Sequence, residues 1–478
     1  MIRDIAGFYY DAERKKYFKI QPNHAGPGQQ HSSQVIKQKE SANKRRKITN
    51  DHRTREARET IFPSRLLTHP LLGRLSLRNQ LGHAAGRFSS LHPSEDVSAY
   101  YAAGLSESLL CGSFKTLPGF AVDEKNGAII FAKSNEDNIG NDTLHCIRSV
   151  RPGRYSGSSH VFEAMPNSFV DMSISVLARK LFYASIGPRG SRVALLEVPR
   201  EEDDPRFRMM HQVWTCNDET AWQTAVSLTG QSFAVASSEG LTHYRMSPSH
   251  TMGTNMWVAR QKPAVAEYMA VAFGQNDRIT MGGRRTGGIT FFDERTNGFV
   301  TRLRHADAVS AIAMIDDDRI VARGLQTMSL YDLRYTKRPS KKEVKSKIAT
   351  APYRTFPWEN ASLEFRLGFD YSSELGIIAT GSSKAMSSNR LLPIHHQTID
   401  LFSVRTGKKL RSLPLSTAHH SQAATCIKFS RIRSTLRPNS ELRIMDNEPL
   451  SLLASSEGRI IEWSCQGDEM ASSDSDAE

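Results

Sequence analysis

Two short segments with the same pattern carry the side chains best suited to binding chemistry. In residues 292–295 (FDER) and 331–334 (YDLR), an aromatic residue and an aspartate are followed two positions later by an arginine. A guanidinium offers five N–H donors in a planar fork, which matches a carboxylate or a pair of carbonyl oxygens. Two such arginines on one surface are suited to holding a protein partner. The chemistry that we predict for Arg295 and Arg334 is therefore recognition.

Residues that could catalyse a reaction do not converge in the sequence. The glycine-rich segment 282–288 (GGRRTGG) lacks the Gly-Lys-Ser/Thr of a phosphate-binding loop and is better explained as a turn between strands. The adjacent histidines at 395–396 and 419–420 would point to opposite faces of a strand and have no third ligand at a recognised spacing. No Gly-x-Ser-x-Gly motif occurs. We expect no enzyme activity, no cofactor and no metal site.

The cysteines and the apolar segments indicate a reduced, intracellular protein. The five cysteines are scattered and form no Cys-x-x-Cys pair, which argues against a zinc ribbon or a disulfide framework. The N-terminus has no apolar signal core, and no stretch reaches the ~18–20 apolar residues of a membrane span. We therefore expect neither secretion nor membrane insertion.

The elements that must position the two arginines belong to a repeat. A short apolar strand rich in small residues recurs seven times, with copies centred on Ala132, Ala184, Ala236, Met281, Ala322, Ala379 and Ala454. The shortest separations between centres, 41 and 45 residues, match the ~40–45-residue period of a propeller blade. Further strands precede and follow most copies. The pattern predicts an all-β fold, a seven-bladed β-propeller, with polar insertion loops at 336–360, 381–398 and 430–449.

The strand ends resemble those of the WD-repeat family. The aromatic-aspartate pairs stand where that family has Trp-Asp, and the segment RHADAVSAI from Arg304 resembles its Gly-His loop. The resemblance implies a WD-repeat propeller over residues 66–467. It also implies that Asp293, Asp332 and His305 are structural residues, each of which stabilises its own blade. We expect the two arginines at the ends of the outermost strands, near one rim of the disc.

An arginine two residues beyond the strand end is similar to the Trp-Asp-x-Arg pattern of the WD-repeat substrate receptors of cullin-4 ubiquitin ligases. The N-terminal segment 7–20 (GFYYDAERKKYFKI) and the segment 66–75 (LLTHPLLGRL) fit the same group. The resemblance implies a non-catalytic receptor that binds the ligase adaptor, the large subunit of the damaged-DNA-binding complex, and presents a target protein for ubiquitination. The residues that it assigns to adaptor binding are Arg295, Arg334, Phe292 and Tyr331.

The N-terminal extension, residues 1–65, has two parts. Segment 7–20 has two aromatic runs around a charged turn, which predicts a hairpin. Such a hairpin is not stable alone, so its aromatic side chains should pack on the propeller or on a partner. These partner-packing side chains are Phe8, Tyr9, Tyr10, Tyr17 and Phe18. The basic segment 33–62 is expected to be disordered or to form a docking helix. It contains the predicted nuclear signal Lys44, Arg45, Arg46 and Lys47. The acidic tail 468–478 is expected to be disordered.

The net charge of +13 leaves alternatives open. One is a ubiquitin-independent WD-repeat scaffold for nuclear or RNA-processing complexes. Another is a nucleic-acid-binding propeller, which the distribution of charge does not favour because the only dense basic cluster lies outside the repeats. In every case we expect protein partners, a monomer within a complex, no membrane contact, and a nuclear location with the cytoplasm as a second compartment.

Overall fold

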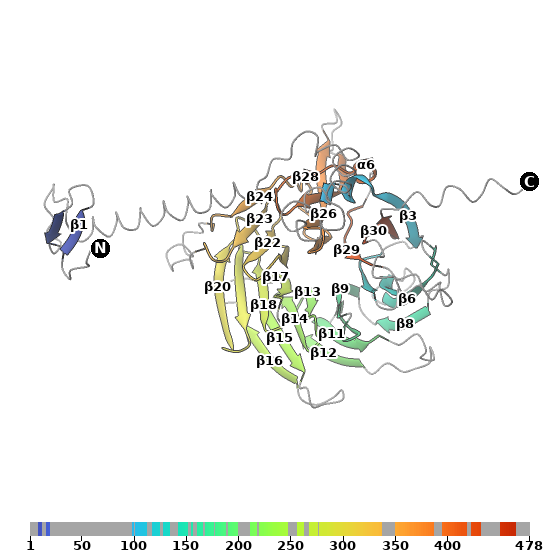
Figure 1. Ribbon diagram of the computed structural model, residues 1–478. Coiled ribbons are helices and arrows are strands. Elements are labelled where there is room, and N and C mark those ends of the chain that lie inside the picture. The colour runs from blue at the N-terminus through green and yellow to red at the C-terminus, as the bar shows by residue number, and fades with distance from the viewer. Residues whose placement is uncertain are drawn as a thin grey trace, which may run out of the picture. The chain divides into compact units, whose positions relative to one another are not determined.

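The computed structural model in Figure 1 divides the chain into two compact units, Met1–His69 and Pro70–Glu478. The structure describes residues 8–11, 16–19 and most of the chain from 98 to 464. Between 98 and 464 the description omits residues 100, 112–116, 125–127, 134–141, 152–153, 156–159, 166–167, 176, 188–189, 199–210, 218, 247–255, 262–266, 276, 337–348, 387–393, 418–421 and 432–449.

In the described part of the second unit, seven antiparallel sheets follow one another along the chain, and we number them as blades 1 to 7. Blade 1 contains β4 (Phe120–Asp123), β5 (Ala128–Lys133), β6 (Asp142–Arg151), β7 (Arg154–Tyr155) and β8 (His160–Met165). Blade 2 contains β9 (Ser168–Ser175), β10 (Lys180–Gly187), β11 (Gly190–Glu197) and β12 (His211–Asn217). Blade 3 contains β13 (Ala221–Val226), β14 (Ser232–Ser237), β15 (Gly240–Met246) and β16 (Met256–Gln261).

The remaining blades have the same plan. Blade 4 contains β17 (Tyr268–Phe273), β18 (Ile279–Arg284), β19 (Gly288–Asp293) and β20 (Gly298–Arg304). Blade 5 contains β21 (Ala311–Met314), β22 (Arg319–Arg323), β23 (Met328–Asp332) and β24 (Arg354–Phe356). Blade 6 contains β25 (Phe369–Ser372), β26 (Ile377–Met386), β27 (Ile394–Ser403) and β28 (Lys409–Leu410). Blade 7 contains β29 (Ile427–Ser430), β30 (Ser451–Ser456), β31 (Arg459–Ser464) and β3 (Ser106–Cys111).

The residues on which the repeat copies are centred occupy the second strand of every blade. All seven, six alanines from Ala132 in β5 to Ala454 in β30 together with Met281 in β18, are fully buried. Seven hydrophobic clusters surround them, and each is shared between two neighbouring blades. Small side chains let adjacent sheets approach closely, and the larger residues around them fill the space between. The predicted seven-bladed propeller is confirmed.

One strand joins the two ends of the propeller. β3, from the start of the described propeller, pairs antiparallel with β31 in the last blade, with Glu107 opposite Trp463. Blade 7 therefore combines strands that lie more than 340 residues apart in the sequence, as the hydrogen bond from Ser106 Oγ to the Ser464 carbonyl illustrates. The repeat pattern did not predict this pairing, because the partner strand β31 lies at the other end of the chain and local spacing does not record it.

The insertions differ in part from the predicted loops. Much of segment 381–398 continues the β26–β27 hairpin, which stays paired as far as Met386 opposite Ile394. The prediction of a polar loop was wrong for residues 381–386 and 394–398, which lie in these two strands. Segment 336–360 supplies β24, the fourth strand of blade 5. Residues 432–449, most of the third insertion, lie outside the described residues.

Helix is scarce in the described residues. The described residues contain a short helix, α6 (Leu413–Thr417), and helical residues at 98–99 and 101–103. No helix among them is long and apolar enough to cross a membrane.

In the first unit, β1 (Phe8–Asp11) and β2 (Lys16–Lys19) form the predicted antiparallel hairpin. The side chains assigned to partner packing, and segments 33–62, 66–75 and 468–478, lie outside what the structure describes.

Candidate functional site

The two arginines follow the third strands of neighbouring blades. Arg295 lies in the turn after β19 of blade 4, and Arg334 lies in the turn after β23 of blade 5. The expectation that they end the outermost strands was wrong, because β20 and β24 pair outside β19 and β23. Each blade has a further strand beyond the aspartate, which the short aromatic pattern alone did not reveal.

The aspartate and the arginine of each motif form a closed turn. In blade 4, Asp293 Oδ1 accepts hydrogen bonds from the backbone N (3.0 Å) and Nε (3.1 Å) of Arg295, and Oδ2 accepts one from Nη2 (2.9 Å). In blade 5 the corresponding distances between Asp332 and Arg334 are 3.1, 2.9 and 2.6 Å. The two-residue spacing therefore lets one carboxylate cap its turn and orient the guanidinium. This explains why the pattern occurs twice.

Both guanidiniums remain accessible while paired. The side chains of Arg295 and Arg334 are 64% and 41% exposed. The hydrogen bond from Arg295 is the main reason why the pKa of Asp293 is lowered, and the same bond raises the pKa of Arg295. Both groups of this pair are therefore charged at neutral pH. The fork uses Nε and Nη2, which leaves the Nη1 donors of the two arginines for a partner or solvent.

The aromatic residues of the motifs lie in the core. Phe292 and Tyr331 are 0% and 1% exposed, so they cannot contact a partner in this structure. The ring of Phe292 lies 4.5 Å from that of Phe299 and 4.9 Å from that of His243 in blade 3. The prediction that these two aromatic residues bind the adaptor is therefore corrected: they anchor the third strands that carry the arginines.

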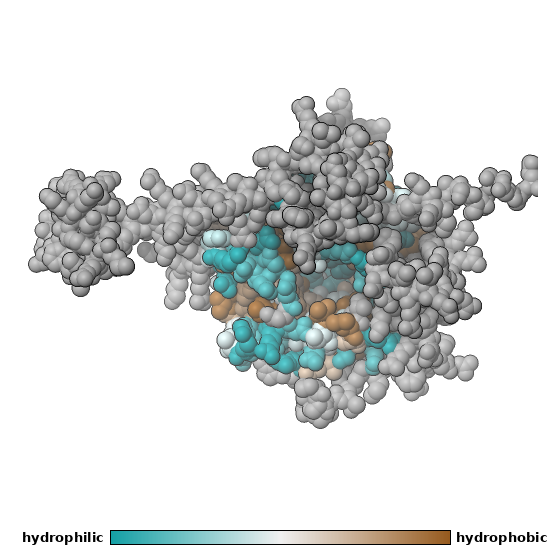
Figure 2. Space-filling view, in the orientation of Figure 1, coloured by the Kyte–Doolittle hydropathy of each residue, from teal (hydrophilic) through white to brown (hydrophobic). Residues whose placement is uncertain are grey.

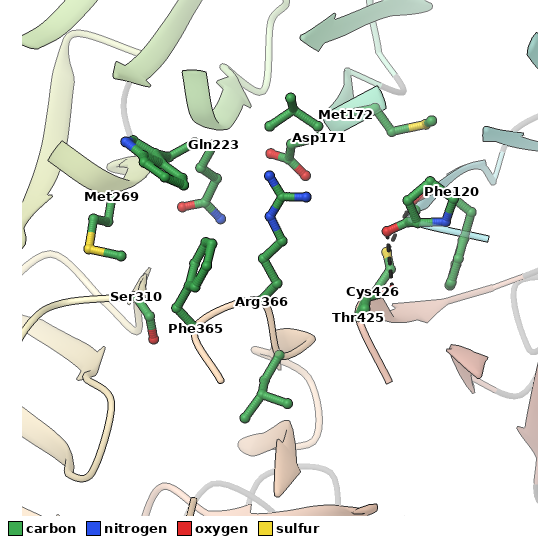
Figure 3. Close-up of a pocket in the computed structure, with 15 residues that line it drawn as sticks. Phe120, Asp171, Met172, Gln223, Met269, Ser310, Phe365, Arg366, Thr425 and Cys426 are labelled. Atoms are coloured by element: carbon green, nitrogen blue, oxygen red, sulfur yellow. Dashed lines mark hydrogen bonds between the residues drawn. The ribbon is translucent and has the colours of Figure 1, made fainter. Parts of the chain in front are cut away.

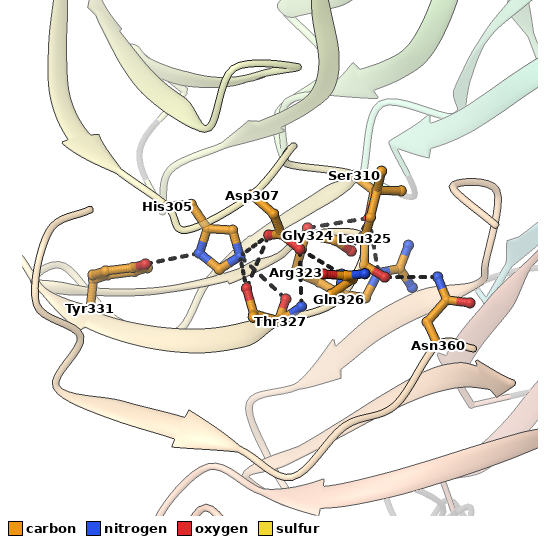
Figure 4. A network of polar contacts seen from close by, with 10 residues as sticks. All are labelled: His305, Asp307, Ser310, Arg323, Gly324, Leu325, Gln326, Thr327, Tyr331 and Asn360. Atoms are coloured by element: carbon orange, nitrogen blue, oxygen red, sulfur yellow. Dashed lines mark hydrogen bonds and ion pairs between the residues drawn. The ribbon is translucent and has the colours of Figure 1, made fainter. Parts of the chain in front are cut away.

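His305 hydrogen-bonds within a polar network at the entrance to blade 5 (Figure 4). Its Nδ1 lies 2.8 Å from the Tyr331 hydroxyl, and its Nε2 lies 3.0 Å from both Thr327 Oγ1 and Asp307 Oδ1. Burial alone raises the pKa of Asp307, but hydrogen bonds from His305, the Gln326 amide and Thr327 outweigh burial and lower it. The fully buried His305 side chain has the bonding expected of a structural histidine.

The glycine-rich segment 282–288 forms the turn between β18 and β19, as predicted. Gly287 has a φ of 86°, and a Cβ there would lie 2.6 Å from the carbonyl oxygen of His305. The position therefore requires glycine for a steric reason.

A third arginine occupies the equivalent place in blade 6, and the sequence analysis missed it. Phe402, at the end of β27, pairs with Ile378 just as Tyr331 pairs with Ile320, and Arg405 follows three residues later. Ser403 replaces the aspartate, and its Oγ accepts a hydrogen bond from the Thr406 amide at 3.3 Å. A search for an aromatic residue three positions before an arginine would have found this copy; a search that also required aspartate could not.

All three arginines lie on one face of the disc. In each blade the first and third strands run in the same direction, so the turn after the third strand lies on the same face as the turn between the first and second strands. We call this the arginine face. It also carries Leu177 and Leu228, which are 67% and 65% exposed in the first turns of blades 2 and 3. These turns are joined by the hydrogen bond from Ser175 Oγ to the Leu228 carbonyl (2.8 Å).

Contacts between neighbouring blades stabilise the arginine face further. Arg245 in blade 3 pairs with Glu294, which precedes Arg295 in its turn. Arg334 also lies 3.3 Å from Asp318 of the first turn of its own blade. The face therefore combines arginines, carboxylates and exposed leucines on turns that are held in place. The space-filling view shows hydrophilic and hydrophobic residues interspersed over the described surface that it displays (Figure 2).

The opposite face carries a small pocket on the propeller axis. It has a volume of about 130 Å³ and is lined by residues at or near the starts of the first strands of all seven blades (Figure 3). A drug-sized ligand usually needs a pocket of ~300–1,000 Å³, so this one suits a single side chain. Burial raises the pKa of the Cys426 thiol in the pocket to about 11, which keeps the thiol protonated and unreactive at neutral pH.

The comparisons with known proteins found similarity among solved structures. No family model and no curated protein matches the chain. A solved structure that it resembles is the β-propeller domain of Cps50 (Swd1) from Myceliophteria thermophila, with 12% sequence identity and a TM-score of 0.49; the match covers 75% of this chain and 99% of that domain. The fold itself, a seven-bladed β-propeller, follows from the seven sheets of the described residues.

Proposed function

We propose that the chain is a non-catalytic substrate receptor that docks on the damaged-DNA-binding adaptor of a cullin-4 ubiquitin ligase and presents a target protein. The proposal rests on one observation: Arg295 and Arg334 project from equivalent turns of adjacent blades, each aligned by the aspartate two residues before it. The segments 7–20 and 330–339 resemble the fourth of the adaptor-and-cullin-associated factors. The basic residues 44–47 would direct such a receptor to the nucleus.

The intramolecular ion pairs favour docking because they orient the arginines in advance. A free arginine loses rotamer entropy when a partner immobilises it, at a cost of about 0.5–1.5 kcal/mol per side chain. Arg295 and Arg334 are already held by two side-chain hydrogen bonds each. A partner that supplies carbonyl or carboxylate acceptors to Nη1 can therefore bind without ordering these side chains. The exposed Leu177 and Leu228 add apolar area on the same face.

The same carboxylates argue against nucleic acid as the partner of this face. Asp293 lies beside Arg295, and both Asp332 and Asp318 lie beside Arg334. Phosphate groups brought to either arginine would meet these negative charges. A ubiquitin-independent protein scaffold remains the second candidate, since it would use the same face and differ only in the partner.

The test is co-purification of the adaptor and cullin-4 with the tagged full-length protein from cells. We expect the double variant Arg295→Ala with Arg334→Ala to recover at least about tenfold less adaptor, because truncation of a partly desolvated arginine at an interface costs ~2 kcal/mol or more. Arg285→Ala is the matched control. Arg285 is also exposed (67%) and paired with a glutamate, Glu267, but it lies between second and third strands, on the opposite face.

Three outcomes separate the candidates. Loss of adaptor with the double variant, but not with Arg285→Ala, supports the receptor. Loss of other proteins in the absence of any adaptor supports the ubiquitin-independent scaffold. Normal recovery of the adaptor by the double variant would remove the main support for the receptor. The melting temperature of Arg285→Ala should stay close to that of the wild type, because an exposed ion pair contributes ~0–1 kcal/mol to stability. Arg334→Ala removes two hydrogen bonds from the buried Asp332 carboxylate, so binding by the double variant is compared at a temperature at which thermal unfolding shows it to be folded.

A further inference from the structure

The axial pocket contains hydrogen-bond donors that no described residue satisfies. Trp222, near the start of β13, lines the pocket with its indole, and its Nε1–H is buried without an acceptor. Gln223 uses its Oε1 to accept a hydrogen bond from the Val271 amide at 2.9 Å, which leaves its Nε2 donors available. A buried donor without an acceptor costs about 1–3 kcal/mol. An arrangement that leaves Trp222 unpaired is therefore expected to have an acceptor in another state of the protein.

The positively charged side chain of Arg366 borders the same pocket. Arg366 lies in the connection before β25 and is exposed, and no described carboxylate lies within ion-pair distance of it. Its guanidinium lies over the ring of Phe365 at 5.6 Å. In Figure 3 it points toward Asp171 on β9, and burial lowers the pKa of Arg366 while Asp171 opposes that shift. The pocket thus combines a positive charge with two kinds of neutral N–H donor.

Asp171 does not complete the site for a basic ligand. Its Oδ2 accepts hydrogen bonds from the backbone N (2.7 Å) and Oγ1 (3.1 Å) of Thr224 in the next blade. Lys428, on β29, further offsets its charge. The carboxylate therefore already serves to join blades 2 and 3, whereas Arg366 and the Nε2 of Gln223 have donors available to a ligand. A ligand cation would also be repelled by Arg366.

The walls of the pocket suit one apolar side chain beside the polar group. Trp222 and Phe365 meet edge to face, with ring centroids 5.4 Å apart, and Met269 lines the pocket on the same side (Figure 3). The volume of about 130 Å³ is close to that of a ~150 Å³ cavity that holds one benzene ring. The pocket is therefore of a size for one or two side chains of a peptide, and too small for a nucleotide or a larger metabolite.

We propose that this axial pocket binds an acidic peptide segment of a protein partner, with a carboxylate on Arg366 and Gln223 Nε2, whose side chains lie beside each other in Figure 3, and a neighbouring apolar side chain against Phe365. The inference does not rest on adaptor docking, because the pocket and the arginine face lie at opposite ends of the first and third strands. One protein could therefore hold an acidic segment on one face and a second partner on the other.

The test is a displayed library of random 12-residue peptides selected on the immobilised full-length protein, with the Arg366→Ala protein as counter-selection. We expect enriched peptides to share an aspartate or glutamate next to an apolar residue. Replacement of that acid by its amide should weaken binding at least about tenfold on the wild type and much less on Arg366→Ala, since hydrogen bonds to charged groups contribute ~1.5–3 kcal/mol. Gln223→Glu, which keeps an acceptor for the Val271 amide but lacks the Nε2 donors, should weaken binding in the same direction.

Controls make each result decisive. The double variant Arg295→Ala with Arg334→Ala should bind the selected peptides like the wild type, which separates this site from the proposed adaptor contact. Peptides with a free C-terminal carboxylate and the same peptides with a C-terminal amide distinguish a terminal from an internal acid as the ligand. The proposal is overturned if no peptide is enriched, if enriched peptides depend on lysine or arginine and lose binding with Asp171→Asn, or if Arg366→Ala binds them equally well.

Discussion

Nη2 of Arg334 lies 2.6 Å from Oδ2 of Asp332, and the same atoms of Arg295 and Asp293 lie 2.9 Å apart. Each aspartate ends a third strand and accepts the backbone N–H of the residue two positions on. The carboxylate is therefore the structural part of the motif and the guanidinium is the accessible part. Removal of the aspartate and removal of the arginine should therefore have different consequences. The two aspartates should also differ from each other, because Asp332 is more buried than Asp293.

We expect Asp332→Asn to destabilise the propeller by about 2–3 kcal/mol, since three hydrogen bonds converge on a charged carboxylate that is 1% exposed. Asp293→Asn should cost about 1 kcal/mol or less, because solvent screens a side chain that is 27% exposed. Urea unfolding of both variants measures the difference. Equal losses would contradict the assignment of a larger capping role to Asp332.

A buried arginine should be among the most sensitive residues of the propeller. Arg323 is 1% exposed and donates from Nη1 to the Gly368 carbonyl (2.8 Å) and from Nη2 to the Leu367 carbonyl (2.8 Å), which connects blade 5 to blade 6. Burial lowers its pKa to about 9, so it stays protonated at pH 7. We expect Arg323→Met to cost about 3–5 kcal/mol, because it leaves these carbonyls buried without donors.

Arg323→Lys is the informative companion to that variant. It keeps the positive charge but cannot reach two separated carbonyls with a planar fork. We expect it to lose at least half as much stability as Arg323→Met, measured by the urea midpoint at pH 7. A lysine variant as stable as the wild type would show that charge alone, rather than the fork, matters at this site.

Much of the fold could be predicted from local sequence, and the exceptions have identifiable causes. The second strands are marked by small residues such as Ala322 and Ala379, which the close approach of neighbouring sheets requires, so their spacing predicted seven blades. β3 could not be found in this way, because its place in blade 7 is set by pairing with a distant strand. The fourth strands of blades 4 and 5 were missed because outer strands are partly exposed and carry a weaker pattern.

The candidate sites were predictable to a smaller extent. Arg295 and Arg334 stand out because the spacing is local and a turn imposes it. The burial of Phe292 and Tyr331 was not apparent, since an aromatic residue in a short motif reads equally well as a contact or as an anchor. The axial pocket was invisible, because Trp222, Asp171 and Arg366 come from three different blades and meet only when the ring closes. No local pattern records that kind of proximity.

Two adjacent residues of β3, the strand that completes blade 7, provide a matched test of how the ring of blades closes. Leu110 is 7% exposed and packs with Phe120 and Leu453 between blades 7 and 1, whereas Leu109 is 56% exposed. We expect Leu110→Asp to destabilise the propeller by about 3 kcal/mol or more, because it buries a charge without a partner. Leu109→Asp should change stability by roughly 0.5 kcal/mol or less. Thermal unfolding of both variants checks the pairing, and similar losses would contradict the observed register.

The pH dependence of stability should reveal Asp171. Burial raises the pKa of its carboxyl, with Thr224 and Lys428 opposing the shift. A raised pKa in the folded state means that the carboxyl contributes its full stability below its ordinary pKa of ~3.9 and loses it as the pH rises through the raised value. The Asp171→Asn variant has no ionisable carboxyl at this position, so it does not lose this stability as the pH rises. The melting temperature of the variant relative to the wild type should therefore increase from pH 4.5 to pH 8.

Asp317→Asn, in the exposed turn before β22, is the control for that measurement. Its melting temperature should follow the wild type across the same pH range. If Asp171→Asn also follows the wild type, the Asp171 carboxyl is not buried as the structure describes. If Asp171→Asn becomes less stable as the pH rises, the charged form is the one that the fold favours.

The third arginine extends the binding prediction to blade 6. Arg405 has the place of Arg334 in blade 5, and Ser403 stands where blade 5 has Asp332. If the arginine face binds the adaptor, Arg405→Ala should weaken the affinity of the purified protein for the purified adaptor by about fivefold, or ~1 kcal/mol, because the contact would extend over three neighbouring blades. Arg285→Ala, on the opposite face, is the control and should bind the adaptor like the wild type. An affinity that Arg405→Ala leaves unchanged would limit the contact to blades 4 and 5.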